Sequence, residues 1–326
     1  MIPGPETAYV VAGVAVRVES DEAVAGWARS VFESQGHSVR GSSDPVVVRV
    51  RVVEALPSPR GVEVSTFVPG TSLWKDGDAR TVAGPNVASV LDLAAGTVDV
   101  LVRRARLGEA GLEVQAHLVV SLSVLLRDRG LFALHAAALT SDAGGLLVVG
   151  PSDVGKSTLS YNLVRAGWRF VSDDSVALGR SERGVEARSL RRAFGLDADA
   201  AERFPEIEAH ARPQMGEPDK WSVDVAALHP QREAEVCLPR LVVFPTITDA
   251  PVSSVEPLPV GDAFVQLVGQ SPLRDADDGR VADHHALLAD LLRQARPALL
   301  RAGTDLLDSD VAGRVLSDAL FQLPPR

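Results

Sequence analysis

Apolar and polar residues alternate over many short segments of the chain, and this period of two predicts half-buried strands. In the N-terminal part we expect one amphipathic helix over residues 21–34, a hairpin turn at Lys75–Asp78 and strands at residues 8–18, 46–53, 62–68, 87–91, 97–102 and around Thr81. The stretch RLGEAGL, residues 106–112, breaks this pattern. We therefore predict a β-rich α+β domain over residues 1–108 and a second domain over residues 109–326.

The second domain mixes continuous apolar runs with helical periodicity, which favours the α/β class. We expect helices over residues 112–126, 261–269, 281–295 and 308–320, and strands over residues 131–140, 146–149, 174–178, 185–189 and 236–246. Residues 197–211 are expected to be helical only in part, because Pro205 interrupts them. Residues 212–220 are polar and are expected to form a loop.

Composition and charge exclude some classes of partner and indicate the cellular compartment. The net charge of −10 gives no basic footprint for nucleic acid or an anionic membrane surface, so neither is an expected partner. Cys237 is the only cysteine, which excludes an internal disulfide and fits a reducing compartment. The N-terminus lacks a basic segment followed by a cleavage signal, and the apolar stretch at residues 118–126 is too short to span a bilayer. A cytoplasmic protein is expected.

The apolar run Leu146–Val149 leads directly into GPSDVGKST, which fits the phosphate-binding spacing G-x-x-x-x-G-K-S/T and is followed by a helical pattern. Glycines let successive backbone N–H groups point inward, and the N-terminus of the helix adds partial positive charge. A lysine at the seventh position reaches the β- and γ-phosphates, and the following hydroxyl is a magnesium ligand. The residues expected to bind nucleotide are Gly150, Pro151, Ser152, Asp153, Val154, Gly155, Lys156, Ser157 and Thr158.

Two adjacent carboxylates, Asp173 and Asp174, follow that helix at the end of an expected strand. Alone they would be read as a solvated turn. Downstream of a phosphate-binding loop, carboxylates at this place can hold magnesium and accept a proton from an attacking hydroxyl. The loop therefore favours a functional interpretation of the pair.

Other polar residues leave two interpretations open. His135 lies within an apolar strand pattern, where a histidine is either a hydrogen-bonded core residue or functional. His284 and His285 are adjacent on a helix and point apart, so they lack metal-ligand spacing. Three cations are candidate phosphate or acceptor contacts, or simply solvated side chains: Lys220, Arg191 and Arg192.

Residues 134–178, LHAAALTSDAGGLLVVGPSDVGKSTLSYNLVRAGWRFVSDDSVAL, resemble the core of the HPr kinase/phosphorylase family. The shared arrangement is a histidine on a strand, a short turn, a strand entering the phosphate-binding loop, a helix and an acidic pair. The resemblance implies the kinase core shared with phosphoenolpyruvate carboxykinase, and transfer of phosphate from ATP to a serine hydroxyl. It also implies that His135 is functional and that the acidic pair serves Mg²⁺ and proton abstraction.

The helix-rich C-terminal residues, the strand LPRLVVFP at residues 238–245 and the loop at Lys220 resemble shorter HPr-kinase-like proteins encoded with peptide natural-product pathways, including lasso peptide kinases. The arginine- and glycine-containing signature that follows the core in HPr kinases has no counterpart here, so an acceptor other than HPr is expected. The first 105 or so residues do not resemble the family's N-terminal domain; we expect them to help recognise the acceptor.

The combined prediction is a kinase that uses ATP and Mg²⁺ to phosphorylate a serine of a peptide or small protein. Asp173 is the expected base, oriented by His135, with Ser157 and Asp174 holding Mg²⁺; the reverse division between the two aspartates stays open. Two alternatives are a small-molecule kinase acting on an amino acid or alcohol, and a non-catalytic ATP-binding regulator. A GTPase or an ABC-type ATPase is disfavoured, because the sequence contains neither N-K-x-D nor L-S-G-G-Q. The oligomeric state is not predicted.

Overall fold

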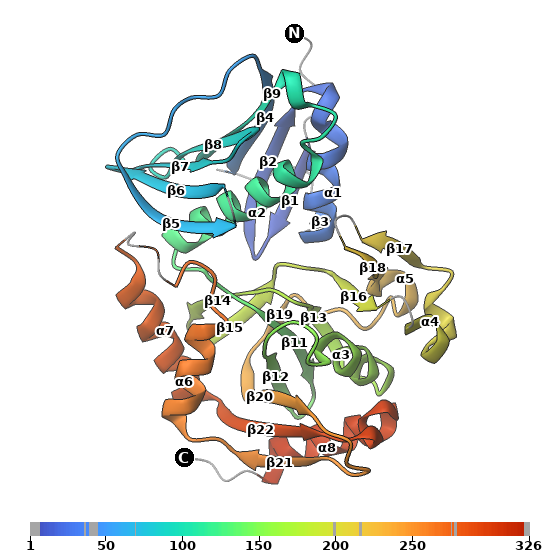
Figure 1. The fold of residues 1–326 in the computed structure, drawn as a ribbon. Coiled ribbons are helices and arrows are strands. Elements are labelled where there is room, and N and C mark those ends of the chain that lie inside the picture. The colour runs from blue at the N-terminus through green and yellow to red at the C-terminus, as the bar shows by residue number, and fades with distance from the viewer. Residues whose placement is uncertain are drawn as a thin grey trace. The chain divides into compact units, whose positions relative to one another are not determined.

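The structure is a computed structural model that describes residues 7–35, 37–38, 45–68, 70–197, 200–214, 217–274, 276 and 279–322. Within these ranges the chain is a mixed α/β protein with four sheets (Figure 1). It divides into two compact units, unit 1 (Met1–Leu131 and Leu273–Ala282) and unit 2 (Phe132–Pro272 and Asp283–Arg326). No helix in the described part of the chain is long and apolar enough to cross a membrane.

Unit 1 contains a nine-stranded sheet in the order β3-β1-β2-β4-β9-β8-β7-β6-β5, in which β2, β4 and β9 are parallel neighbours. Its elements are β1 (Thr7–Val11), β2 (Val14–Ser20), η1 (Glu22–Val24), α1 (Ala25–Gln35), β3 (His37–Ser38), β4 (Val46–Val53), β5 (Val62–Val68), β6 (Thr71–Asp76), β7 (Ala79–Ala83), β8 (Val87–Asp92), β9 (Thr97–Arg103), η2 (Arg104–Arg106) and α2 (Gly111–Asp128).

The predicted strands at β4 and β5 and the hairpin turn between β6 and β7 are confirmed. The single strand predicted over residues 8–18 is wrong. It is a hairpin of β1 and β2, because Ala12 and Gly13 both take positive φ angles, of 51° and 82°, and turn the chain back on itself. The alternation of apolar residues continues through the turn, so the pattern alone concealed it.

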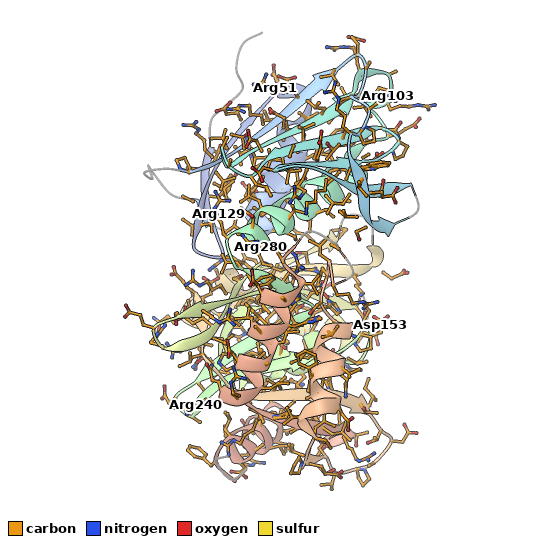
Figure 2. The ribbon with its side chains drawn as sticks, turned by 90° about the vertical axis from the view of Figure 1, so that its left-hand side faces the viewer. Arg51, Arg103, Arg129, Asp153, Arg240 and Arg280 are labelled. Carbon is orange, nitrogen blue, oxygen red and sulfur yellow. The ribbon has the colours of Figure 1, made fainter. Side chains whose placement is uncertain are left out.

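The predicted domain boundary lies at residue 108, whereas the compact units divide after Leu131. Helix α2 belongs to unit 1: it packs against α1 and β8, and Glu113 accepts hydrogen bonds from the backbone N–H groups of Asn86 and Val87, at 2.8 and 2.9 Å. Arg280, labelled in Figure 2, donates to the carbonyl and carboxylate of Asp128 at the end of α2. This contact ties residues 279–282 to unit 1.

Unit 2 holds three sheets, with strand orders β13-β11-β12-β20-β22-β21, β10-β14-β15-β19 and β16-β18-β17. Its elements are β10 (Phe132–Leu134), β11 (Ala136–Ser141), β12 (Gly144–Val149), α3 (Lys156–Arg165), β13 (Arg169–Ser172), β14 (Val176–Ser181), β15 (Gly184–Ser189), β16 (Ala193–Asp197), α4 (Ala200–Arg203), η3 (Pro205–Ile207), β17 (Ala211–Gln214), β18 (Glu217–Asp224), α5 (Val225–Leu228), β19 (Val236–Cys237), β20 (Pro239–Ile247), β21 (Ser254–Pro257), α6 (Val260–Gly269), α7 (Val281–Gln294), β22 (Arg296–Ala302), η4 (Thr304–Leu307) and α8 (Ser309–Gln322).

The six-stranded sheet is buried on both faces, which explains its continuous apolar runs. Leu146 and Val148 of β12 point into a core shared with α3 and α8, whereas Leu147 and Val149 point into a core shared with α6 and α7. Strands β12, β20 and β22 are parallel, so their carboxyl ends lie at the same edge of the sheet. The loop that carries the phosphate-binding motif leaves this edge from β12.

Two corrections in unit 2 bear on the site. Residues 131–140 do not form one strand, because β10 belongs to the four-stranded sheet and β11 to the six-stranded sheet, with His135 between them. Residues 212–220, predicted to be a loop, lie instead mostly in strands β17 and β18, which pair with each other, and β18 pairs with β16. The polar composition of these strands is typical of a loop, because side chains such as Arg212 and Asp219 in this small sheet are exposed to solvent.

In unit 2 the chain passes twice between the six-stranded and the four-stranded sheet, and the two passages lie opposite each other. Leu134 pairs with Val176 in the four-stranded sheet, and Ala138 pairs with Ser172 in the six-stranded sheet. His135 therefore lies opposite the short segment between β13 and β14, which contains the two aspartates.

Candidate active site

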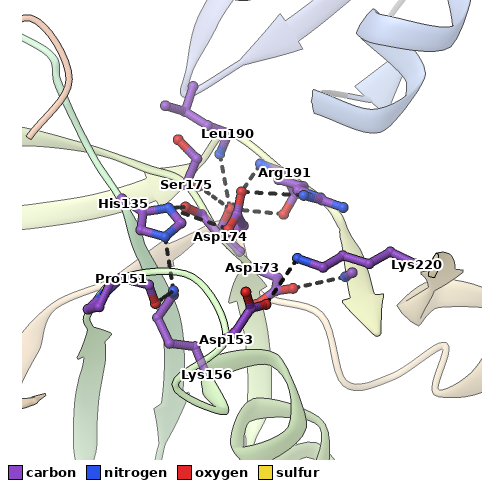
Figure 3. Close-up of polar contacts among 12 residues, drawn as sticks. His135, Pro151, Asp153, Lys156, Asp173, Asp174, Ser175, Leu190, Arg191 and Lys220 are labelled. Atoms are coloured by element: carbon purple, nitrogen blue, oxygen red, sulfur yellow. Dashed lines mark hydrogen bonds and ion pairs between the residues drawn. The ribbon is translucent and has the colours of Figure 1, made fainter. Parts of the chain in front are cut away.

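A cavity of about 130 Å³ opens at the N-terminus of α3. It joins the phosphate-binding motif, the two passages and the small sheet, as the close-up in Figure 3 shows for the polar groups. Its lining residues are His135, Ser152, Asp153, Gly155, Lys156, Ser157, Thr158, Asp173, Asp174, Arg191, Gly195, Asp197 and Lys220.

The motif forms a strand–loop–helix, in the order predicted. Gly155 precedes α3 with a φ of 80°, a left-handed conformation that glycine adopts without a steric penalty, and no side chain in the described part of the protein caps the helix. The first N–H groups of a helix have no partner within it, so they are available to an anion. Asp153 also has a positive φ, 65°, and its side chain is 76% exposed.

Lys156 is almost fully buried and bound by its own loop. Its ammonium donates to the carbonyls of Gly150 and Pro151, at 2.9 and 2.7 Å, and to Nε2 of His135 at 2.9 Å. Burial lowers the pKa of Lys156, and the carboxylates of Asp174 and Asp173 oppose this effect. The ammonium is thus held at the floor of the cavity before any ligand arrives.

His135 connects this lysine to the acidic pair. Because Nε2 accepts from Lys156, Nδ1 carries the proton and donates to the main-chain carbonyl of Asp174 at 2.8 Å. The same nitrogen lies 3.4 Å from Oδ1 of Asp174. We expected His135 to orient Asp173; its contacts are with the neighbouring aspartate instead.

Asp174 faces the open side of the cavity, with its side chain 43% exposed. Its φ of 64° lies in the left-handed region, which is uncommon for a residue other than glycine and is enriched at functional sites. The Arg191 guanidinium pairs with Oδ2 over 3.4 Å. The carboxylate is therefore held between a histidine and an arginine while it remains accessible.

Asp173 differs from its neighbour in that it is fully buried. Its Oδ2 accepts the backbone N–H of Gly195 at 3.0 Å, whereas Oδ1 is buried without a hydrogen-bond partner among the described residues. Burial raises the pKa of Asp173, with opposing contributions from Arg191, the Gly195 N–H and the Ser157 hydroxyl. The unsatisfied oxygen marks a place where a ligand of positive charge would be stabilised.

Ser172 fixes the turn that carries both aspartates. Its hydroxyl oxygen lies 2.6 Å from the Ser175 carbonyl and 2.9 Å from the Arg191 carbonyl, which share its one proton, and it accepts from the Arg191 N–H at 2.9 Å. Sequence reasoning missed Ser172, Gly195 and Asp197 as site residues. Gly195 and Asp197 lie on β16 of the three-stranded sheet, and their place beside the aspartates depends on how separate sheets pack together, which leaves no local signal in the sequence.

Two of the three candidate cations line the cavity, and the third does not. Lys220 lies on β18 and reaches back to the phosphate-binding loop, where its Nζ is 3.5 Å from Oδ1 of Asp153. Arg191 lines the cavity beside Asp174. Arg192 does not line it: its guanidinium binds Glu233 at 2.6 Å. Consecutive residues of an extended segment point to opposite sides, which places Arg191 inward and Arg192 away.

The comparisons with known proteins are sparse. The chain matches no protein-family model and no curated protein. Among solved structures it is similar to the HPr(Ser) kinase/phosphatase from Coxiella burnetii, with 14% sequence identity and a TM-score of 0.31. That match covers 58% of this chain and 97% of the other. A likeness of this size assigns no activity to the chain.

Proposed function

We propose that this chain is a kinase that uses ATP and Mg²⁺ to phosphorylate a hydroxyl group. One observation carries the proposal: the lysine of a phosphate-binding motif and two carboxylates line the same cavity at the N-terminus of a helix. Phosphoryl transfer needs little covalent chemistry from a protein, but it does need cations and N–H groups around the phosphates and an acceptor for a proton. Lys156 is the cation for the phosphates, and Asp174 is the acceptor for the proton.

The cavity suits a triphosphate. Lys156 at its floor and the helix N-terminus behind it favour a group of several negative charges. Lys220 and Arg191 add two more cations to the lining. Lys220 pairs with Asp153 and Arg191 pairs with Asp174, so both cations are held at the cavity lining.

The residues also fit magnesium. A magnesium ion bound to a nucleotide takes one or two protein ligands and fills its other positions with phosphate oxygens and water. The buried, unsatisfied Oδ1 of Asp173 and the nearby Ser157 hydroxyl are oxygen donors of the required type. Bound there, the metal ion would neutralise charge on the β- and γ-phosphates. We therefore propose Ser157 and Asp173 as its protein ligands.

Asp174 is then the base, which reverses the roles first expected for the two aspartates. Its exposed carboxylate can accept the proton of an acceptor hydroxyl, whereas the carboxylate of Asp173 is fully buried. As the proton moves to Asp174, the hydroxyl oxygen forms a bond to the γ-phosphorus and the bond to the β-phosphate oxygen breaks, leaving ADP. His135 positions Asp174 through its carbonyl, and Arg191 holds the carboxylate.

The acceptor class rests on the resemblance of residues 134–178 to kinases of serine hydroxyls, so we propose a serine of a peptide or small protein. A small-molecule alcohol would be activated by the same carboxylate. An ATP-binding regulator that transfers no phosphate needs no carboxylate exposed at the cavity mouth. The position of Asp174 therefore favours a kinase over such a regulator.

Binding and transfer can be separated with two variants. We expect Lys156→Ala to lose Mg-ATP binding measured by calorimetry, because it removes the buried cation at the cavity floor. Asp174→Asn should keep binding within about threefold but lose acceptor-dependent ADP formation by roughly 10²–10⁴-fold, the range for a general base. Equal turnover in Asp174→Asn and wild type would exclude the proposed base; undiminished ATP binding in Lys156→Ala would exclude the proposed nucleotide site.

A further inference from the structure

Strand β20 ends against the phosphate-binding loop. Pro245 and Ile247 are two residues apart on this strand and so lie on one face of it. A Cβ atom placed on Gly150 would lie 3.8 Å from Cδ of Pro245, and one placed on Gly155 would lie 3.6 Å from Cδ1 of Ile247. The two side chains thus lie next to the first and last glycines of the motif.

These two side chains differ in exposure. Pro245 is buried and supports the loop from below, whereas Ile247 is 61% exposed although it is a large branched aliphatic residue. Packing against Gly155 uses only part of its surface. A backbone frame holds Ile247 in place: it pairs with Ala302 of β22, and the N–H of Thr248 donates to the Ala302 carbonyl at 2.8 Å. The end of β20 therefore holds an exposed apolar side chain in a fixed position beside the loop.

The order of strands decides which part of a nucleotide could meet this surface. Strand β12, which leads into the loop, lies between β11 and β20. His135 and the aspartates come from the β11 and β13 side, whereas Ile247 comes from the β20 side. If the γ-phosphate lies near Asp174, a triphosphate that follows the loop away from the β11 side would place the nucleoside on the β20 side.

We propose that Ile247 contacts the nucleoside part of ATP, an inference that rests on the proposed function. The contact is apolar: the side chain covers one face of the base or the adjoining sugar and removes it from water. It contributes to affinity for nucleotides but not to affinity for a bare chain of phosphates. The difference between these two ligands is what the experiment measures.

Calorimetry on the full chain with Mg-ATP and with inorganic tripolyphosphate tests this directly. Ile247→Ala should weaken Mg-ATP binding by about fivefold to tenfold, the size expected for losing part of one aliphatic contact, and leave tripolyphosphate binding unchanged. Val265→Ala is the matched control, since Val265 is a similarly exposed aliphatic residue, 70% exposed, that lies on α6 and not on β20. It should leave both affinities unchanged.

Other outcomes overturn the inference in different ways. If Ile247→Ala weakens ATP and tripolyphosphate equally, Ile247 shapes the phosphate-binding loop instead of contacting the nucleoside. If it weakens neither, the side chain makes no contact with the ligand. If the wild-type chain binds neither ligand, the nucleotide site itself is wrong, and the inference fails together with the proposed function. An unchanged melting temperature would show that the variant is folded, as expected for an exposed side chain.

Discussion

His135 donates a hydrogen bond to the main-chain carbonyl of Asp174 over 2.8 Å, and its other ring nitrogen accepts from Lys156 over 2.9 Å. One imidazole therefore joins the lysine of the phosphate-binding loop to the turn that carries the proposed base. The contact exists because the chain passes between sheets at His135 and again at the aspartates, and β10 and β14 hold the two passages side by side.

Replacing His135 should impair transfer more than binding. His135→Ala leaves the Asp174 carbonyl without its donor and frees the turn, so we expect kcat to fall about 10–100-fold, with the KM for ATP changed less than about threefold. Steady-state kinetics with saturating acceptor measures both constants. A parallel loss of kcat and ATP affinity would indicate that the ring serves mainly to fold the phosphate-binding loop.

Asp173→Asn should separate metal binding from folding. Burying a carboxylate costs free energy, and an amide of the same shape avoids that cost, so the free chain should melt at the same or a higher temperature. Stabilisation by Mg-ATP should fall sharply, because a metal ligand is lost. Thermal unfolding with and without Mg-ATP provides the comparison, with Asp174→Asn as the control that retains stabilisation. Full stabilisation of Asp173→Asn would remove Asp173 from the metal site.

Unit 1 should lose stability in mild acid because of His117. Its ring is fully buried beside Ser89, and burial lowers its pKa to about 4, with Glu113 opposing. An unfolded histidine has a pKa of about 6.5. Between these values the unfolded chain binds a proton that the folded chain excludes, so stability is complete above about pH 6.5 and falls toward pH 4.

Going from about pH 7 to about pH 5, this linkage amounts to a loss of about 2 kcal/mol in the free energy of unfolding. His117→Gln removes the titrating group, so its unfolding free energy should depend less on pH by that amount. Urea unfolding of both proteins at the two pH values makes the measurement. Identical pH dependence of the two would show that His117 does not carry the effect.

Gly145 should resist substitution because β12 and β20 approach closely there. A Cβ atom at Gly145 would lie 2.4 Å from the Leu238 carbonyl oxygen and 2.6 Å from Sγ of Cys237. Gly145→Ala should therefore destabilise unit 2 by about 2–3 kcal/mol. Gly261→Ala on α6, with nothing within 4 Å, should instead stabilise it by about 0.5–1 kcal/mol. Chemical denaturation compares the two, and equal effects would contradict the packing described here.

The sequence predicted those parts of the site that are local in the chain. The loop spacing before α3 and the acidic pair are short patterns whose chemistry does not depend on distant residues. The break at His135 was missed, because apolar residues flank it on both sides and no turn residue marks the change of sheet. The sequence also could not show which aspartate His135 contacts. That choice depends on the direction of the backbone at Asp174, whose φ is positive.

Contacts between residues of different sheets could not be predicted from the sequence, for a different reason. Gly195 reaches Asp173 from β16, and Lys220 reaches Asp153 from β18, a segment whose polar composition predicted a loop. The buried strand predicted over residues 236–246 stops short of Ile247, and only the structure shows that this residue ends β20 with most of its side chain exposed. In each case the missing information is which elements become neighbours after folding.

The most direct test is to follow phosphate from γ-labelled ATP into a pool of serine-containing peptides, with the wild-type chain and Asp174→Asn. Asparagine suits this position because it tolerates the left-handed backbone that Asp174 adopts, so the variant removes the charge and leaves the fold. We expect magnesium-dependent label on serine with the wild type and at least about 100-fold less with the variant. Label transferred equally by both proteins would contradict the proposed mechanism. Bound but untransferred ATP with every hydroxyl acceptor supplied, peptides and small alcohols alike, would contradict the kinase itself.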